Sequence, residues 1–186
     1  WIVVGAGTGG TSATIGRYLR FRCHDTQVCV ADPEGSVFSA YHRSGDTTLT
    51  APGSRIEGIG RPRVEPSFVR TLVDRMLEVP NLDSVAAMHA LSALLGRKVG
   101  PSTGTNFVGM LAVAHEMRAA GQQGSILSLL CDAGERYLPS YHDADWVRNA
   151  FGDIAPAQQR IDALMAGWRC RRAPPGASSG GGSCCW

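Results

Sequence analysis

A glycine-rich turn between an apolar run and a helical stretch constrains the fold most. The apolar run covers residues 2–4, the turn reads Gly5-Ala6-Gly7-Thr8-Gly9-Gly10, and a helix is expected over residues 11–21. Glycines let the backbone approach an anion closely, and the free N–H groups of a helix N-terminus favour negative charge. The turn therefore predicts a phosphate site. The competing interpretation is a tight turn that needs glycine only for packing.

Apolar runs and helical stretches alternate along most of the chain. Further strands are expected at residues 27–31, 76–79 and 125–131, and further helices at 81–95 and around 107–117. This alternation predicts an α/β fold, with a parallel sheet covered by helices on both faces. Residues 40–66 carry turn formers and arginines, and they are expected to form a long loop near a site.

Composition limits the classes of protein that fit. The chain has 186 residues, about one domain, and its hydrophobic content of 44% can build a buried core. A net charge of +2 argues against nucleic acid as a partner, and no apolar run reaches the length of a membrane span. With no signal peptide ahead of the first strand, a cytoplasmic protein is expected.

Cysteine spacing and the C-terminal composition complete the outline. The six cysteines show no C-x-x-C pair, so no metal site is expected, and Cys29 and Cys131 lie in apolar runs where a thiol packs as a small core residue. Residues 1–150 are expected to form the main domain. Residues 151–186 are expected to be a helical remnant followed, from about Ala173, by a disordered Pro/Gly/Ser-rich tail.

One interpretation of the turn is a dinucleotide site. Gly5, Gly7 and Gly10 satisfy the pattern G-x-G-x-x-G, and Asp32 at the end of the second strand is placed to bind a ribose. The chain would then be an NAD- or FAD-binding Rossmann oxidoreductase. The pattern is weak, because 23 of the 186 residues are glycine and because Asp32 precedes Pro33, a common start of a turn.

Four motifs taken together favour a different phosphate ligand. They are Gly7-Thr8-Gly9-Gly10-Thr11, Gly53-Ser54-Arg55-Ile56-Glu57-Gly58-Ile59-Gly60, Gly100-Pro101-Ser102-Thr103-Gly104-Thr105 and Gly134-Glu135-Arg136-Tyr137-Leu138. Their order over residues 1–142 resembles the fold type II pyridoxal-phosphate enzymes, the family of cysteine synthase, cystathionine β-synthase and cysteine desulfhydrase. A dinucleotide enzyme is not expected to carry the last three.

This resemblance implies a fold, a cofactor and the residues that hold it. The fold is that of the large domain of a tryptophan synthase β-like enzyme, and the cofactor is pyridoxal 5′-phosphate. The implied contacts are the phosphate on Gly7, Thr8, Gly9, Gly10 and Thr11, the pyridine nitrogen on Ser102, and the substrate channel beside Gly58. A neutral hydroxyl at the positive end of a helix disfavours a protonated ring nitrogen. Ser102 also suits the simpler role of a helix N-cap.

Charged residues near the last motif receive smaller roles. Asp132, at the end of the apolar run, is a candidate to lie near the cofactor ring. Glu135 and Arg136 are expected to form no more than a surface pair.

The resemblance also implies an activity, and the chain lacks part of what that activity needs. Family members eliminate or replace the β-substituent of cysteine or O-acetylserine, small amino-acid substrates, and are usually homodimers. In the family, the lysine that anchors the cofactor and the asparagine loop that binds substrate both precede the phosphate loop. Here Lys98 is the only lysine, and it lies elsewhere.

The missing lysine sets the expectation for the chain alone. It is expected to be the C-terminal part of the cofactor-binding domain, with no catalytic residue of its own. It should bind the cofactor weakly and should not turn over. A non-catalytic remnant is the alternative.

Overall fold

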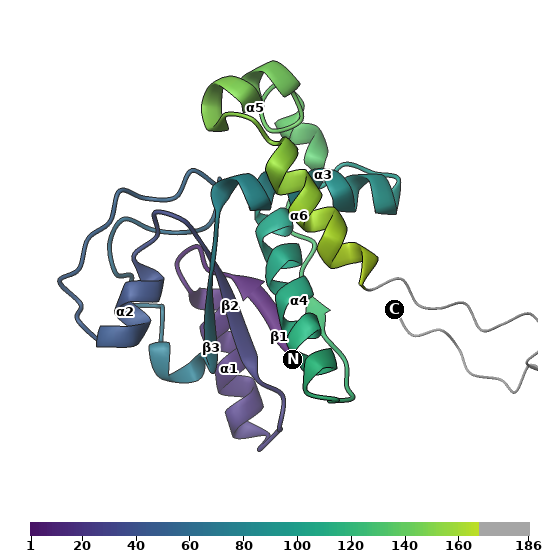
Figure 1. Cartoon of the computed structure of the whole chain (residues 1–186). Helices are drawn as coiled ribbons and strands as arrows, with labels where there is room; N and C mark the ends of the chain where they lie inside the picture. The colour runs from purple at the N-terminus through teal and green to yellow at the C-terminus, as the bar shows by residue number, and fades with distance from the viewer. Residues whose placement is uncertain (168–186) are drawn as a thin grey trace, which may run out of the picture.

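A parallel sheet of four strands forms the centre of the computed structural model, which describes residues 1–167. The strands are β1 (Ile2–Gly5), β2 (Val28–Pro33), β3 (Arg75–Val79) and β4 (Leu127–Ser128), in the order β3-β2-β1-β4. Val3 pairs with Cys29, and Val30 pairs with Met76. Figure 1 shows the sheet with the connecting helices around it. The predicted α/β fold with a parallel sheet is confirmed.

Helices connect the strands and extend beyond the sheet. They are α1 (Gly10–Phe21), α2 (Phe38–Ser44), α3 (Asn81–Leu95), α4 (Pro101–Ala119), α5 (Ala144–Phe151) and α6 (Ala155–Ala166), with two short 3-10 turns, η1 (Arg70–Leu72) and η2 (Gly134–Tyr137). β3 passes into α3 through Pro80 alone. Figure 1 shows α3 and α5 at the end of the sheet where β3 finishes.

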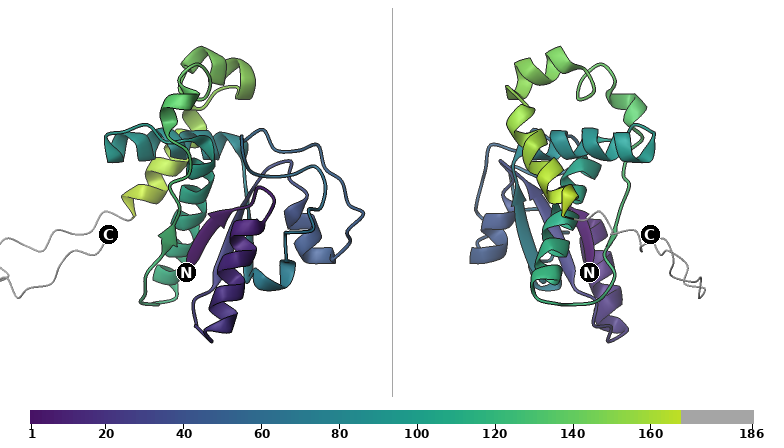
Figure 2. Two further views of the ribbon diagram at one scale, coloured as in Figure 1. Left: turned by 180° about the vertical axis from the view of Figure 1, so that it is seen from behind. Right: turned by 45° about the vertical axis from the view of Figure 1, so that its right-hand side comes forward.

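Successive residues of the strands bury their side chains on opposite faces of the sheet. Val4 and Val30 pack with Leu19 of α1 and Phe38 of α2 on one face, where the rings of Phe38 and Phe68 stack with centroids 4.4 Å apart. Val3, Cys29, Ala31 and Val113 of α4 form the cluster on the other face. Helices therefore cover both faces, as predicted (Figure 2).

Two glycines allow α4 to pack against α3 and the sheet together. A Cβ at Gly104 would collide with the carbonyl oxygen of Ser84 in α3. A Cβ at Gly109 would lie 2.9 Å from side-chain atoms of Val3 and Ala31. The closeness of α3 and α4 creates a further core cluster, to which α6 contributes Ile161.

Three predictions about local structure are wrong. The apolar run 125–131 pairs with the sheet only at Leu127–Ser128, because β4 is an edge strand with β1 as its one partner, and Leu127, Leu129 and Leu130 are exposed. Cys131 is also exposed rather than core, since the chain has left the sheet there, whereas Cys29 is fully buried as expected. The supposed loop 40–66 begins inside α2.

No helix in residues 1–167 is long and apolar enough to cross a membrane. Within the same residues, no group of three His, Cys, Asp or Glu side chains could hold a metal ion. The predicted Pro/Gly/Ser-rich tail from Ala173, with Cys170, Cys184 and Cys185 near or in it, lies outside the described residues.

Candidate functional site

The glycine-rich turn leaves β1 at Gly5 and enters α1 at Gly10. Gly9 has a φ of 87°, and a Cβ there would lie 2.6 Å from the Cα of Phe68. A Cβ at Gly7 would lie 2.7 Å from the carbonyl oxygen of Gly58. Close approach of the 58–68 segment therefore explains these two glycines, as the packing interpretation of the turn proposed.

Gly10 is different, because packing does not require it. A Cβ there would meet only the hydroxyl of Thr8, at 3.8 Å, and its φ is not positive. The N–H groups of Gly7 through Thr11 donate no hydrogen bond to any described residue. The first turn of α1 contains no acidic residue. The turn thus presents unpaired donors at the positive end of a helix, which is a suitable cradle for an anion.

The segment after residue 57 supports the turn from behind. The Gly60 N–H donates to the carbonyl of Ala6 at 2.8 Å, and the Ser67 hydroxyl donates to the carbonyl of Thr8 at 2.7 Å. Arg61 Nε donates to the carbonyl of Gly7 at 3.2 Å, so a guanidinium lies beside the cradle. Sequence reasoning did not single out Arg61; the only signal was the arginine content of the 40–66 stretch.

Ser102 is the second residue of α4 and is only 5% exposed. Gly100, not Ser102, occupies the N-cap position, so the N-cap interpretation of Ser102 is wrong. The Ser102 hydroxyl makes no hydrogen bond to a described residue. One turn further along α4, the amide oxygen of Asn106 approaches Gly5 so closely that a Cβ at Gly5 would lie 3.2 Å from it. The start of α4 therefore lies next to the start of the glycine-rich turn.

The second and fourth motifs contact each other, although about 80 residues separate them in the sequence. The Tyr141 hydroxyl donates to the carbonyl of Arg55 at 2.7 Å and accepts from the N–H of Glu57 at 3.1 Å. Arg136 pairs with Glu57 at 2.8 Å, not with its sequence neighbour Glu135. Gly58, next in the chain, is exposed with a φ of 89° and has open space around its Cα.

Asp132 lies beside the first turn of α4. Its carbonyl accepts from the N–H of Gly100 at 3.0 Å, and its Oδ2 accepts from the Tyr137 hydroxyl at 2.7 Å. Burial, followed by the hydrogen bond to Asp132, raises the pKa of Tyr137 well above its ordinary value. The Asp132 carboxylate thus holds the fourth motif, residues 134–138, near the start of α4.

Asp32 does not have the environment of a ribose ligand. It is only 1% exposed, and its Oδ2 accepts from both the N–H and the hydroxyl of Ser39 at 2.8 Å. Burial raises the pKa of its carboxyl above the ordinary value. Asp32 therefore connects β2 to α2, and the dinucleotide interpretation is not supported.

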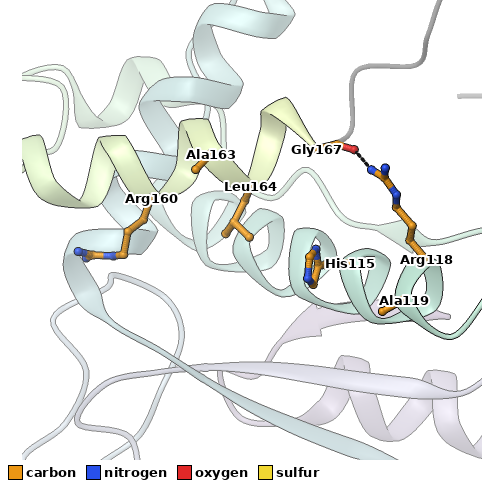
Figure 3. Close-up of a pocket in the computed structure, with 7 residues that line it drawn as sticks. All are labelled: His115, Arg118, Ala119, Arg160, Ala163, Leu164 and Gly167. Carbon is orange, nitrogen blue, oxygen red and sulfur yellow. Dashed lines mark hydrogen bonds between the residues drawn. The ribbon is translucent and has the colours of Figure 1, made fainter.

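A groove of about 730 Å³ lies between α4 and α6 and is a separate feature (Figure 3). Its lining includes His115, Arg118 and Leu164. His115 follows Ser102 by 13 residues in α4. At a rise of about 1.5 Å per residue, that separation is about 20 Å along the helix. The groove is therefore distant from the first turn of α4.

Comparison with known proteins identifies the class to which this fold and this turn belong. The profile of the family described as "Pyridoxal-phosphate dependent enzyme" matches residues 1–132. The chain belongs to this family, which confirms the resemblance seen in its motifs.

Particular relatives narrow the comparison. L-cysteine desulfhydrase Cds1 of Mycobacterium tuberculosis is 56% identical over 148 residues, which are 79% of this chain and 40% of that protein. Cysteine synthase 2 of Schizosaccharomyces pombe is 30% identical over 158 residues, 78% of this chain and 39% of that protein. The solved O-acetylserine dependent cystathionine beta-synthase from Helicobacter pylori matches with a TM-score of 0.60 and 29% identity, over 75% of this chain and 42% of that one. The chain thus spans about 40% of the length of these relatives.

Proposed function

We propose that this chain holds pyridoxal 5′-phosphate in the cradle formed by Gly7, Thr8, Gly9, Gly10 and Thr11. The observation that carries the proposal is the set of unpaired N–H groups in this turn, together with a Gly10 whose added Cβ would meet only the Thr8 hydroxyl. A phosphate dianion needs several donors and a positive surrounding, and both are present. The hydroxyls of Thr8 and Thr11 lie on exposed residues, and the Arg61 guanidinium adds positive charge.

Ser102 is proposed as the partner of the ring nitrogen. Its hydroxyl is neutral, it lies at the positive end of α4, and it has no partner among the described residues. Such a group favours a neutral ring nitrogen over a protonated one. When bound, the cofactor withdraws electrons from an amino acid, so that bonds at its α-carbon break more easily. A neutral nitrogen moderates that withdrawal, which favours prompt loss of a β-substituent.

The proposed activity of the whole protein is elimination or replacement at the β-carbon of cysteine or O-acetylserine. Support comes from relatives named as a cysteine desulfhydrase, a cysteine synthase and an O-acetylserine dependent cystathionine beta-synthase. We assign no catalytic residue to this chain. Lys98, its only lysine, is exposed, and its carbonyl accepts from the N–H of Gly134 at 3.2 Å. Gly58, exposed and flanked by the contacts of Tyr141 and Arg136, is proposed to line the route taken by a small amino-acid substrate.

The cofactor proposal is tested by titrating the full 186-residue chain with pyridoxine 5′-phosphate. This probe has the ring and the phosphate but no aldehyde, so it cannot react with Lys98 or the terminal amine. Saturable binding that NADH and FAD do not displace is the expected result. Failure to bind, or displacement by either dinucleotide, would contradict the proposal.

Activity requires a separate assay. The chain alone should release no sulfide from L-cysteine, whereas a longer protein that also carries the family's lysine should release it or form cysteine from O-acetylserine and sulfide. Sulfide release by the chain alone, abolished by Lys98→Ala, would refute the assignment of no catalytic residue. A homodimeric assembly and a cytoplasmic location are part of the same proposal, and sedimentation and cell fractionation test them.

A further inference from the structure

We propose that Asn106 is a positioning residue that sets the distance between the phosphate cradle and Ser102. The inference rests on the proposed function, because it concerns how two parts of one cofactor would be held at once. Asn106 is 1% exposed and lies one helical turn beyond Ser102 on α4. Residues four apart on a helix share a face, so a shift of Asn106 is passed to Ser102.

Four hydrogen bonds join the first turns of α4 to the segment that follows β4. The Gly100 N–H donates to the carbonyl of Asp132 at 3.0 Å, and the Cys131 N–H donates to the hydroxyl of Thr103 at 2.9 Å. Asn106 Nδ2 donates to the carbonyl of Leu129 at 3.2 Å and to the Cys131 Sγ at 3.5 Å. The bonds from Asn106 lie furthest from the N-terminus of α4, so they fix the tilt of its first turns as well as their position.

The other end of the Asn106 amide approaches Gly5, the last residue of β1. Its Oδ1 is buried and has no hydrogen-bond partner among the described residues. A Cβ added to Gly5 would lie 3.2 Å from this oxygen, and β1 passes from Gly5 directly into the turn. One rigid, planar amide therefore lies between α4 and the end of β1, two residues before the phosphate cradle. An unpaired buried oxygen is costly, and its retention here is consistent with a positional requirement.

Asn81 provides a matched control. It is also a buried asparagine, 8% exposed, with an Oδ1 that lacks a partner among the described residues. It lies at the first position of α3, where its backbone N–H donates to the Glu34 carboxylate at 3.3 Å. Among the described residues it makes no hydrogen bond to Gly5 or Ser102. Truncation of either asparagine leaves a comparable cavity, but only Asn106 lies between the two parts of the proposed site.

The test compares two probes on the full 186-residue chain. Inorganic phosphate engages the cradle alone, whereas pyridoxine 5′-phosphate engages the cradle and Ser102 together. In Asn106→Ala the Kd for pyridoxine 5′-phosphate should rise at least about tenfold, while the Kd for inorganic phosphate changes less than about twofold, since misplacement acts on the second contact. Asn81→Ala should leave both Kd values nearly unchanged. Equal losses for both probes, or equal effects of both variants, would overturn the inference.

Two further measurements keep the inference testable under other outcomes. If Asn106→Ala does not fold, Asn106→Leu keeps a γ-branched side chain but removes the donor to Leu129, and it should give the same selective loss. If the unaltered chain binds no pyridoxine 5′-phosphate, the proposed function fails, and amide chemical shifts of the unliganded protein still decide the positioning role. Asn106→Ala should shift the Gly7 and Ser102 signals together, and shifts confined to residues 129–131 would refute it.

Discussion

Gly9 and Gly10 are neighbours in the turn, and replacement of each by alanine should have opposite effects on stability. At Gly10 the added methyl meets only Thr8, and the backbone is one that alanine adopts freely. Alanine also reduces the freedom of the unfolded chain, which stabilises a protein by about 0.4–1 kcal/mol when the site is compatible. Gly10→Ala should therefore leave the free energy of unfolding unchanged or raise it slightly.

Gly9→Ala should destabilise the fold. The left-handed backbone with a φ of 87° costs a non-glycine residue about 1–2 kcal/mol, and overpacking against Phe68 adds about 1–3 kcal/mol. The free energy of unfolding should fall by roughly 2–5 kcal/mol.

Gly10→Ala should weaken binding even though it does not destabilise the fold. The methyl of Gly10→Ala occupies the cradle above the unpaired N–H groups, and loss of one charge-assisted hydrogen bond costs about 1.5–3 kcal/mol. That corresponds to a rise in the Kd for pyridoxine 5′-phosphate of roughly 10- to 150-fold. Urea unfolding and fluorescence titration measure the two quantities, and Thr14→Ala, on an exposed residue of the same helix, is the control. A Gly10→Ala protein that binds as tightly as the unaltered chain would show that phosphate does not lie over Gly10.

Three other changes probe the rest of the structure. Burial lowers the pKa values of both His89 and His142 from the ordinary value of 6.5, so the unfolded chain takes up protons at a higher pH than the folded chain does. The free energy of unfolding should therefore fall as the pH drops below about 6.5, and His142→Gln should weaken this dependence, whereas an unchanged slope would contradict it. Asp32→Asn should leave binding of pyridoxine 5′-phosphate unchanged, because the carboxylate bonds to Ser39; loss of binding in titration would revive a ligand role. Tyr141→Phe, which removes two hydrogen bonds to the 55–57 loop, should lower the free energy of unfolding by about 1–3 kcal/mol in urea melts, and a neutral effect would mean that the loop is held otherwise.

Local patterns predicted the sheet and its helices well where burial is simple. The runs predicted at residues 2–4, 27–31 and 76–79 coincide with β1, β2 and β3, and the periodicity of residues 81–95 matches α3. The prediction for residues 125–131 was wrong because an apolar run shows hydrophobicity but not which strands lie beside it. Its leucines suit a core, yet β4 pairs on one side only and those leucines are exposed.

The candidate site was only partly predictable for a related reason. The motif marked every glycine of the turn alike, but Gly7 and Gly9 are explained by contacts with Gly58 and Phe68, and Gly10 by none. Which glycine is a packing requirement depends on a segment about 50 residues away, and the sequence does not place that segment. Arg61 was missed for the same reason.

The contacts behind the turn also have a consequence for the order of assembly. The turn is held by bonds from Arg61 and Ser67, which lie 54 and 59 residues further along the chain, and the 55–57 loop is held by Tyr141 across as many as 86 residues. Closing such long loops is entropically costly and slow compared with forming local helix. During synthesis from the N-terminus, β1 and α1 leave the ribosome before Arg61 and Ser67, so the cradle between them gains its supports only after those residues have emerged, and the 55–57 loop is fixed only after Tyr141 has followed. The cradle is thus completed well after the strand and the helix that flank it.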